Sequence, residues 1–458
     1  MIRHVVRAIV LIALVSGSAQ IARAQGRDRA ALPTAIDSVV QSFLKDGKAA
    51  GMSIAVVKGR DTIALKGYGM ADLELDVPTP AHAVYEIGSV TKQFTAASIL
   101  LLQEEGKLSL DDDVTKVLSD YTTQGHAVTI RRLLDHTSGI KGYTEMPVFN
   151  ALMARHLPKD TLVKLFQKEP FEFSPGEMQV YNNSAYFLLG LVIEKVSGMS
   201  YADFVKQRLF DKVGMTDSQY CSERTIIKRK VKGYDMGPTG LVNKGLLDHT
   251  WPYSAGSLCS SAADLVSWNR ALHGGRVLSA ASYKSMTSPA VLGDGTKLRY
   301  GMGLALHTFN GHRTIEHGGG INGFLSESAY FPDDDAIIIV LVNSAGPVSP
   351  NAVTAALADL VLGTVKRESR AAPDGIAALA GTYKGVGRGQ QMVVTVSADS
   401  GRLNVTMPRQ KPATPRYIGD DTWEEGDTRF TFRKKGSATP ELRVDAAYGH
   451  SVLARSGT

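Results

Sequence analysis

The chain is poor in cysteine, because Cys221 and Cys259 are the only two among its 458 residues. No Cys/His spacing in it resembles a zinc site, so the sequence indicates no bound metal. Two cysteines can form a disulfide in an oxidising compartment. Sequence alone does not show whether their Cα atoms come within bridging distance, so the pairing stays open.

Long apolar runs are also scarce. After residue 24 no segment of about 18 or more apolar residues follows, which predicts no transmembrane helix. The N-terminus carries Arg3 and Arg7, a short apolar run over 8–15, and the small-x-small signal Ala22-Arg23-Ala24. We interpret residues 1–24 as a signal peptide cleaved after Ala24, and expect a periplasmic or secreted protein with no stable membrane insertion.

A large charge of one sign is missing as well. The formal net charge of +6 falls to +3 without the three arginines of residues 1–24, and basic residues are scattered apart from a local run over 228–232. A solvated surface loop explains this run better than a nucleic-acid site, so we expect no nucleic-acid partner. Apolar residues at 43% and charged residues at 21% are ordinary values for a folded globular protein.

The order of periodic segments predicts an α+β fold. A helical pattern over 31–47 and a hairpin over 52–69 precede a mostly helical stretch from Lys92 to about Leu272. Strand patterns return over 300–309, 312–319, 324–332 and 336–344, and a helix follows over 351–364. We therefore expect the first and last segments to share one antiparallel sheet, flanked by terminal helices, with a helical lobe inserted between them.

We predict four regions along the chain. Residues 1–24 form the signal peptide, and residues 25–364 form the main domain. Residues 365–375 are charged and then rich in small residues, Pro and Gly, as in a linker. Residues 376–458 alternate short apolar runs with turn residues, which is typical of a small all-β domain.

Three Ser-x-x-Lys pairs make this motif weak by itself. They are Ser42/Lys45, Ser89/Lys92 and Ser138/Lys141. Ser42 lies inside a predicted helix, and Ser138 precedes Gly139 in a predicted turn. Only Ser89 follows an extended segment and starts a helix, where its N–H is unpaired and the positive end of the helix dipole is near. Helix capping and nucleophilic catalysis are equally compatible with this pair alone.

Two further patterns favour catalysis. Tyr181-x-Asn183 precedes a long apolar helix, and His317 ends a predicted strand and is followed by three glycines. Glycines permit close approach to a strand backbone. Either residue alone is more typical of packing than of chemistry. His136, in a Asp-His-Thr-Ser-Gly segment, we assign to capping or turn bonding.

Together, Ser89-x-x-Lys92, Tyr181-x-Asn183 and His317-x-Gly319 resemble the motifs of the serine beta-lactamase-like hydrolases related to class C beta-lactamases and D-Ala-D-Ala carboxypeptidases. The similarity covers about residues 35–363. It implies a beta-lactamase/transpeptidase-like fold, a serine hydrolase activity and no cofactor or metal. One difference is that many relatives have Lys-Thr-Gly where this chain has His317-Gly318-Gly319, so a fixed cation for a substrate carboxylate is missing from that strand.

The resemblance also implies a role for each residue. Ser89 would be the nucleophile, with Lys92 and Tyr181 as general acid and base. Asn183 would orient Lys92 or a substrate amide, and His317 would line the cleft and hydrogen-bond the Tyr181 oxygen or the substrate. The N–H groups of Ser89 and Gly320 would form the oxyanion hole, and Gly319 would belong to the same glycine segment.

The sequence leaves the substrate open. Our first hypothesis is an exported serine hydrolase that cleaves an ester or amide of a small molecule or peptide. A D,D-peptidase or weak beta-lactamase acting on peptidoglycan-type substrates is a second, and a non-catalytic peptide- or glycan-binding module with a hydrolase-like fold is a third. The sequence does not indicate the oligomeric state.

Overall fold

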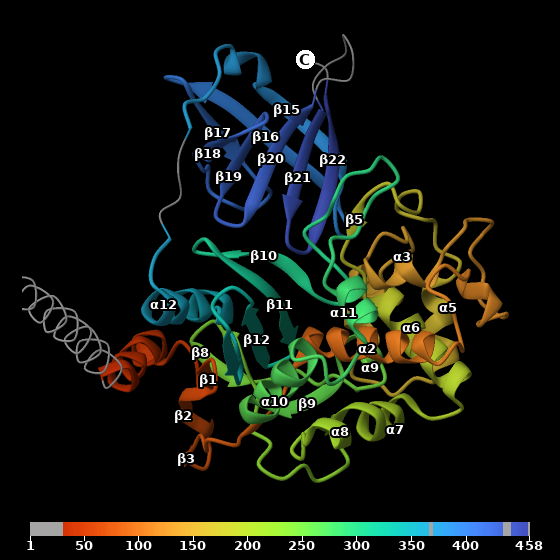
Figure 1. Ribbon diagram of the computed structural model, residues 1–458, viewed down its shortest axis with the longest axis vertical. Coiled ribbons are helices and arrows are strands. Elements are labelled where there is room, and N and C mark those ends of the chain that lie inside the picture. The colour runs from red at the N-terminus through yellow and green to blue at the C-terminus, as the bar shows by residue number, and fades with distance from the viewer. Residues whose placement is uncertain (1–30, 366–369, 434–440, 457–458) are drawn as a thin grey trace, which may run out of the picture.

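The computed structural model describes residues 31–365, 370–433 and 441–456. The predicted signal peptide lies outside these residues. The fold is α+β, as expected, and consists of a central antiparallel sheet, a helical lobe beside it and an all-β region at the C-terminus (Figure 1). No helix in the described ranges is long and apolar enough to cross a membrane.

The central sheet joins the two ends of the main domain. Its strand order is β10-β11-β12-β13-β1-β2-β3. The bounds are β1 (Gly51–Lys58), β2 (Asp61–Asp72), β3 (Val77–Pro78), β10 (Ala305–Phe309), β11 (His312–Ile321), β12 (Phe324–Phe331) and β13 (Ala336–Val342). Strand β1 pairs with β13 from Met52↔Val342 to Lys58↔Ala336. The expected contact between the first and last strands is therefore confirmed.

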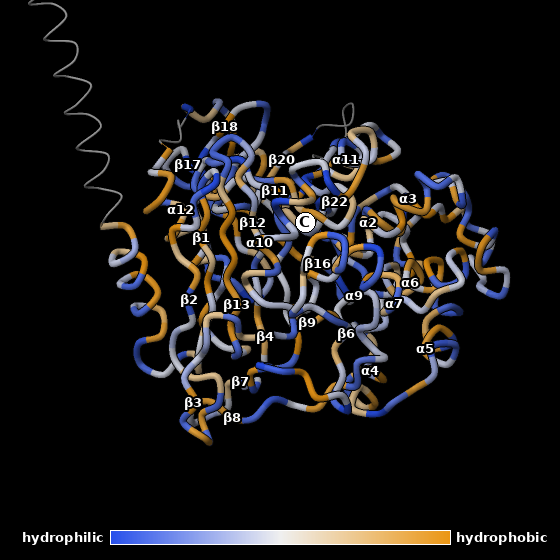
Figure 2. Tube along the Cα trace, turned by 60° about the horizontal axis from the view of Figure 1, so that its bottom comes forward, coloured by the Kyte–Doolittle hydropathy of each residue, from blue (hydrophilic) through white to orange (hydrophobic). Residues whose placement is uncertain are grey.

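Both faces of this sheet are covered by helices. All seven residues of β13 are buried, and its hydrophobic stretch lies beside that of β1 in the middle of the sheet (Figure 2). Such continuous apolar strands are expected where both faces are buried. The helix over residues 31–44 and α12 (Pro350–Leu362) pack on one face, and α10 (Ala262–His273) packs on the other.

The inserted lobe contains two long buried helices, α2 (Thr91–Glu104) and α6 (Asn183–Ser197). The Asn182 side chain accepts a hydrogen bond from the Ala185 N–H at 2.9 Å and so caps α6. The other helices are α3 (Ile130–Leu134), α4 (Pro147–Leu152), α5 (Lys159–Phe166), α7 (Tyr201–Val205), α8 (Asp211–Val213), α9 (Tyr253–Gly256) and α11 (Ala280–Met286).

The middle region is less helical than its sequence suggested. Four of its strands, together with β4 and β14 from outside the region, form two small sheets of order β4-β9-β6 and β14-β7-β8. Their bounds are β4 (Val84–Glu86), β6 (Gln219–Tyr220), β7 (Tyr234–Gly237), β8 (Gly240–Asn243), β9 (Leu258–Ser261) and β14 (Ser344–Ala345). These strands have two to four residues each, too few for an alternating pattern, so pairing with distant partners determines them.

The C-terminal strands form a second large sheet of order β17-β16-β15-β22-β21-β20-β19-β18. The bounds are β15 (Gly381–Val386), β16 (Gln391–Asp399), β17 (Arg402–Thr406), β18 (Arg416–Gly419), β19 (Thr422–Glu425), β20 (Thr428–Arg433), β21 (Glu441–Ala446) and β22 (Gly449–Arg455). Strand β5 (Gln179–Val180), from the helical lobe, pairs with β22. The all-β region is thus joined to the chain directly before Tyr181.

The two cysteines, which the sequence left open, form a disulfide. The Cα atoms of Cys221 and Cys259 are 5.2 Å apart, and both side chains are buried. Cys259 lies on β9, which pairs with β4, the strand that leads to Ser89.

We expect the Cys221→Ala/Cys259→Ala double variant to lose about 2–4 kcal/mol of stability, because a crosslink across 38 residues restricts the unfolded chain. Chemical denaturation of the variant beside the oxidised protein measures this difference. An unchanged midpoint would show that the disulfide contributes nothing to stability.

Candidate active site

Ser89 lies in a tight turn between the small sheet and α2. Strand β4 ends at Glu86, the 3₁₀ turn Gly88–Val90 follows, and α2 begins at Thr91. Gly88 has a positive φ of 49°, and a Cβ added there would lie 2.9 Å from the Gly320 nitrogen. Glycine is therefore required at this position. The turn places Ser89 at the N-terminal end of a long helix, as the sequence predicted.

The Lys92 ammonium is held beside Ser89 by two fixed acceptors. Its Nζ lies 2.8 Å from Asn183 Oδ1, 2.8 Å from the Ala255 carbonyl oxygen and 3.2 Å from Ser89 Oγ. The side chain is completely buried. Burial lowers the pKa of Lys92 well below its usual value; the nearby Arg388 charge lowers it further, and Glu145 acts in the opposite direction.

This geometry determines where a neutral Lys92 would direct its lone pair. A neutral amine has two hydrogens. The atoms that face Lys92 are Asn183 Oδ1 and the Ala255 carbonyl oxygen, and both can only accept a hydrogen bond. Both hydrogens would then be used, and the lone pair would face Ser89 Oγ. The buried lysine is thus arranged to accept the serine proton.

Tyr181 completes the group. Lys92 Nζ lies 4.7 Å from the centre of the Tyr181 ring. The phenolic oxygen is buried and makes no hydrogen bond of normal geometry within the described part of the chain. Burial raises the pKa of Tyr181, while the nearby Ser89 hydroxyl and the Arg388 charge oppose this shift. The structure therefore brings Ser89, Lys92, Tyr181 and Asn183 together.

The glycine segment lies within β11, next to the Ser89 turn. The Ser326 hydroxyl on β12 donates to the Ile87 carbonyl oxygen at 2.8 Å and joins the turn to the sheet. A Cβ added to Gly319 would lie 2.2 Å from that carbonyl oxygen and 3.1 Å from the Ser89 nitrogen. Gly319 is thus required because the Ser89 turn packs directly against the backbone of β11 at this position. Gly320 lines the cavity beside Ser89.

We expect Gly319→Ala to be destabilised by about 1–3 kcal/mol, because the added methyl group has no space between the turn and β12. Gly320→Ala is the matched control, since a Cβ there meets only the Leu325 side chain at 3.5 Å. Thermal unfolding of both variants makes the comparison. Equal melting temperatures would show that the turn moves away at no cost.

The structure corrects the predicted position of His317. Its ring does not hydrogen-bond Tyr181 and is not among the described residues that line the cavity. Nδ1 donates to the Gly318 carbonyl oxygen at 2.5 Å, and Nε2 accepts from the Tyr300 hydroxyl at 3.1 Å. Burial, followed by the Lys92 charge, lowers the pKa of His317 to about 4, so the ring is neutral at pH 7.

The His136 side chain hydrogen-bonds the backbone beside the site, in line with the capping or turn bonding that its sequence context suggested. Its Nδ1 accepts a hydrogen bond from the Asn182 N–H at 3.1 Å. Its ring lies 4.4 Å from the Tyr181 ring, centre to centre. His136 therefore supports the segment that carries Tyr181 and Asn183.

The C-terminal region supplies two side chains that the sequence did not indicate. The Tyr448 hydroxyl accepts a hydrogen bond from the Gly318 N–H at 2.7 Å and donates to Glu316 at 2.8 Å. Arg388 lies with its Cζ 5.0 Å from the centre of the Tyr181 ring. Neither residue belongs to a motif, and both lie in turns of the C-terminal sheet, far from Ser89 and Tyr181 in the sequence.

The cavity beside Ser89 has a volume of about 300 Å³. Its described lining residues come from the Ser89 turn, the helical lobe, β11 and the C-terminal region. They are Gly88, Ser89, Tyr143, Thr144, Phe149, Asn183, Leu247, Pro252, Ala255, Gly256, Gly320, Ile321, Asn322 and Arg388. The cavity therefore lies between the sheet and the helical lobe, with room for a small ligand.

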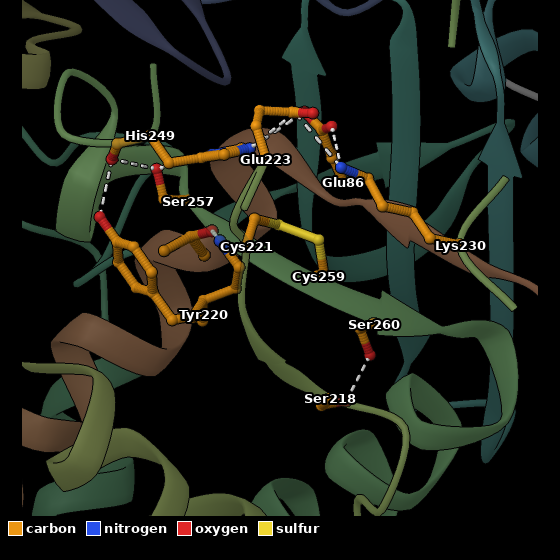
Figure 3. The surroundings of a disulfide bond; sticks show 12 residues. Glu86, Ser218, Tyr220, Cys221, Glu223, Lys230, His249, Ser257, Cys259 and Ser260 are labelled. Carbon is orange, nitrogen blue, oxygen red and sulfur yellow. Dashed lines mark hydrogen bonds and ion pairs between the residues drawn. A yellow bond between two sulfur atoms is a disulfide. The ribbon is translucent and has the colours of Figure 1, made fainter. Parts of the chain in front are cut away.

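One group within the described residues has the composition of a metal site. Glu86, Glu223 and His249 present possible ligand atoms within 4.8 Å of one another, close to the disulfide (Figure 3). Lys230 Nζ lies 3.1 Å from Glu86 and 3.3 Å from Glu223, and Lys244 contacts the same two carboxylates. Because two ammonium groups already balance the two carboxylates, the arrangement is better explained as an ion-pair network.

The fold and the arrangement of a serine hydroxyl, a buried amine and a phenol define a serine hydrolase. The comparisons agree, because the Beta-lactamase family model matches residues 36–363. The chain belongs to the beta-lactamase family.

Similar proteins include penicillin-binding proteins and an amidohydrolase. Penicillin-binding protein 4* of Bacillus subtilis is 31% identical over 306 residues, which are 64% of this chain and 67% of that relative. Several other curated relatives match over 62% of their own length. The D-stereospecific amidohydrolase of a Streptomyces species has a TM-score of 0.62 at 26% identity, over 74% of this chain and 99% of that one.

A third neighbour is similar to almost the whole chain. The octameric penicillin-binding protein homologue from Pyrococcus abyssi has a TM-score of 0.64 at 24% identity, over 92% of this chain and 99% of that one. At this identity the similarity concerns the fold alone.

Proposed function

We propose that the protein is an exported serine hydrolase that cleaves an ester or amide through an acyl-enzyme on Ser89. The main supporting observation is Lys92, which is completely buried, held by Asn183 and Ala255, and placed 3.2 Å from Ser89 Oγ. A charged surface lysine would not serve as a base at neutral pH, but a buried one with a lowered pKa can.

In the acylation step, Ser89 Oγ forms a bond to the substrate carbonyl carbon and Lys92 Nζ takes the hydroxyl proton. The carbonyl oxygen becomes an oxyanion, which the N–H groups of Ser89 and Gly320 would stabilise. As the oxyanion collapses, the bond to the leaving group breaks. The leaving alcohol or amine takes a proton, and we assign Tyr181 as its donor. Tyr181 then regains a proton from Lys92.

In the deacylation step, water replaces Ser89 as the nucleophile. A water molecule attacks the acyl carbon, and Tyr181 or Lys92 takes its proton. The bond between the acyl carbon and Ser89 Oγ then breaks, and Ser89 regains its proton. Of these two bases, Lys92 is the better candidate for the first proton transfer, because burial lowers its pKa but raises that of Tyr181.

Export and substrate class are parts of the same proposal. The buried Cys221–Cys259 disulfide supports an oxidising compartment, in agreement with the predicted signal peptide. Similarity to a D-stereospecific amidohydrolase and to penicillin-binding proteins favours amides of D-amino acids over simple esters. A complete group of Ser89, Lys92 and Tyr181, with Ser89 at the cavity, argues against the hypothesis of a binding module.

A substrate panel tests this proposal. p-Nitrophenyl esters, a chromogenic cephalosporin and D-Ala-D-Ala peptides are assayed with the wild-type protein and with Ser89→Ala. We expect Ser89-dependent turnover, with the D-amino-acid peptides hydrolysed fastest. Turnover of all three that is unaffected by Ser89→Ala would contradict the proposal.

A further inference from the structure

A turn of the C-terminal sheet contributes to the cavity. Residues 387–390 connect β15 to β16, and the Gly387 N–H donates to the Gln390 carbonyl oxygen at 3.0 Å. Gly389 has a positive φ of 66°, and a Cβ added there would lie 2.6 Å from Cβ of Glu145. The turn is therefore packed tightly against the helical lobe, and this contact places Arg388 over the cavity.

The Arg388 guanidinium is oriented but not fully used. Its Nε donates to Glu145 Oε1 at 2.6 Å, and Nη2 lies 3.5 Å from Thr144 Oγ1. A guanidinium has five N–H donors, so these two contacts leave donors for a further acceptor. The side chain is 47% exposed, and it lines the same cavity as Ser89.

Arg388 also has a distinct electrostatic position. Among the described residues that line the cavity, it is the only one with a charged side chain. Other ion pairs join the same two regions away from the cavity, such as Arg443 with Asp294 at 2.7 Å. Attachment of the C-terminal region therefore does not explain why an arginine is placed beside Tyr181.

We propose that Arg388 binds a carboxylate on the leaving group of the substrate, so that the preferred substrates are acyl derivatives of an amino or hydroxy acid with a free carboxylate. This inference rests on the proposed function. Arg388 lies over the face of Tyr181, which would protonate the leaving group, so an anion bound there belongs to that part of the substrate. An arginine can bind a carboxylate through two parallel hydrogen bonds.

The cation is thus supplied from a different part of the chain. Relatives with Lys-Thr-Gly have a lysine on the strand where this chain has His317, and His317 is buried and neutral at pH 7. Arg388 reaches the cavity from the C-terminal sheet instead. The all-β region would then determine substrate selectivity directly.

A matched pair of thioesters tests the proposal. The substrates are the N-benzoyl-D-alanyl thioester of thioglycolic acid and the same compound as its methyl ester, with thiol release as the readout. The variants are Arg388→Gln, Arg388→Lys and, as a control, Arg402→Gln at an exposed position of the same sheet. Thermal unfolding of each variant checks that the C-terminal region stays folded.

We expect Arg388→Gln to lower kcat/KM for the acid by about 10- to 100-fold, mainly through KM, as for the loss of a charge-assisted hydrogen bond. With wild-type and variant proteins assayed above the rising limb of their pH profiles, the methyl ester should change less than about 3-fold. Arg388→Lys should retain part of the preference because it keeps the charge without the planar donors. Arg402→Gln should keep the wild-type ratio.

Three results would overturn the proposal. They are an unchanged preference for the acid in Arg388→Gln, an equal loss with both substrates, and a gain with both, which would identify Arg388 as a blocking residue. Labelling of Ser89 by a neutral fluorophosphonate in the same preparations separates the possible failures. A labelled protein with no preference contradicts only the role of Arg388, whereas absence of labelling contradicts the proposed function as well.

Discussion

Ser89→Ala should lower kcat for the best substrate of the panel on the order of 10⁴-fold or more, since the acyl-enzyme can no longer form. Ser89 Oγ is contacted by Lys92 at 3.2 Å, a contact between two side chains at the cavity, so the fold should tolerate the change. Steady-state kinetics and a thermal melt of the same preparation measure the two quantities separately.

Ser42→Ala is the matched control. Ser42 belongs to another Ser-x-x-Lys pair, but it is exposed on the helix over 31–44 and donates to the Val39 carbonyl oxygen at 2.6 Å. Its substitution should leave kcat unchanged. If Ser42→Ala lost activity and Ser89→Ala did not, the assignment of the nucleophile would be wrong.

Lys92→Met and Tyr181→Phe should each lower kcat/KM by about 10² to 10⁴-fold, the usual contribution of a general acid or base. Methionine fills the buried volume of the lysine without an ionisable group, and Phe removes only the phenolic oxygen. Lys45→Met, in the exposed pair with Ser42, should retain activity. The kinetics of all three variants make the test.

The pH dependence of kcat/KM tests the role of Lys92 as a base. Lys92 acts as a base only when it is neutral, so kcat/KM should rise with pH through the pKa of Lys92, which burial places well below its usual value. Because the Arg388 charge also lowers this pKa, Arg388→Gln should move the rising limb to higher pH. A limb that stays in place in Arg388→Gln would show that another group controls it.

The sequence predicted the parts of the fold that depend on local patterns. The apolar runs of β1 and β13 indicated buried strands, and their pairing followed from the order of elements along the chain. The short strands β4, β6 and β9 could not be predicted, because each depends on a partner far away in the sequence. The disulfide could not be predicted either, since it depends on the distance between β9 and the segment directly after β6.

The same distinction applies to the site. The Ser89, Tyr181 and His317 segments were found because each has a motif next to a predicted element. The predicted hydrogen bond from His317 to Tyr181 was wrong, since the ring bonds Tyr300 and Gly318, which the motif does not indicate. Arg388 was missed because it meets Glu145 across 243 residues of sequence, and a Gly-Arg-Gly turn has no signature for an active site.

The central claim is that Ser89, which is partly exposed and lines the cavity, is an activated nucleophile. The most direct measurement is covalent labelling of the full-length protein with a fluorophosphonate, followed by mass spectrometry of the intact protein and of its peptides. The account predicts one adduct per chain, on the peptide that contains Ser89, and its loss in Ser89→Ala but not in Ser42→Ala. An unlabelled wild-type protein, or an adduct on a different serine, would contradict the account.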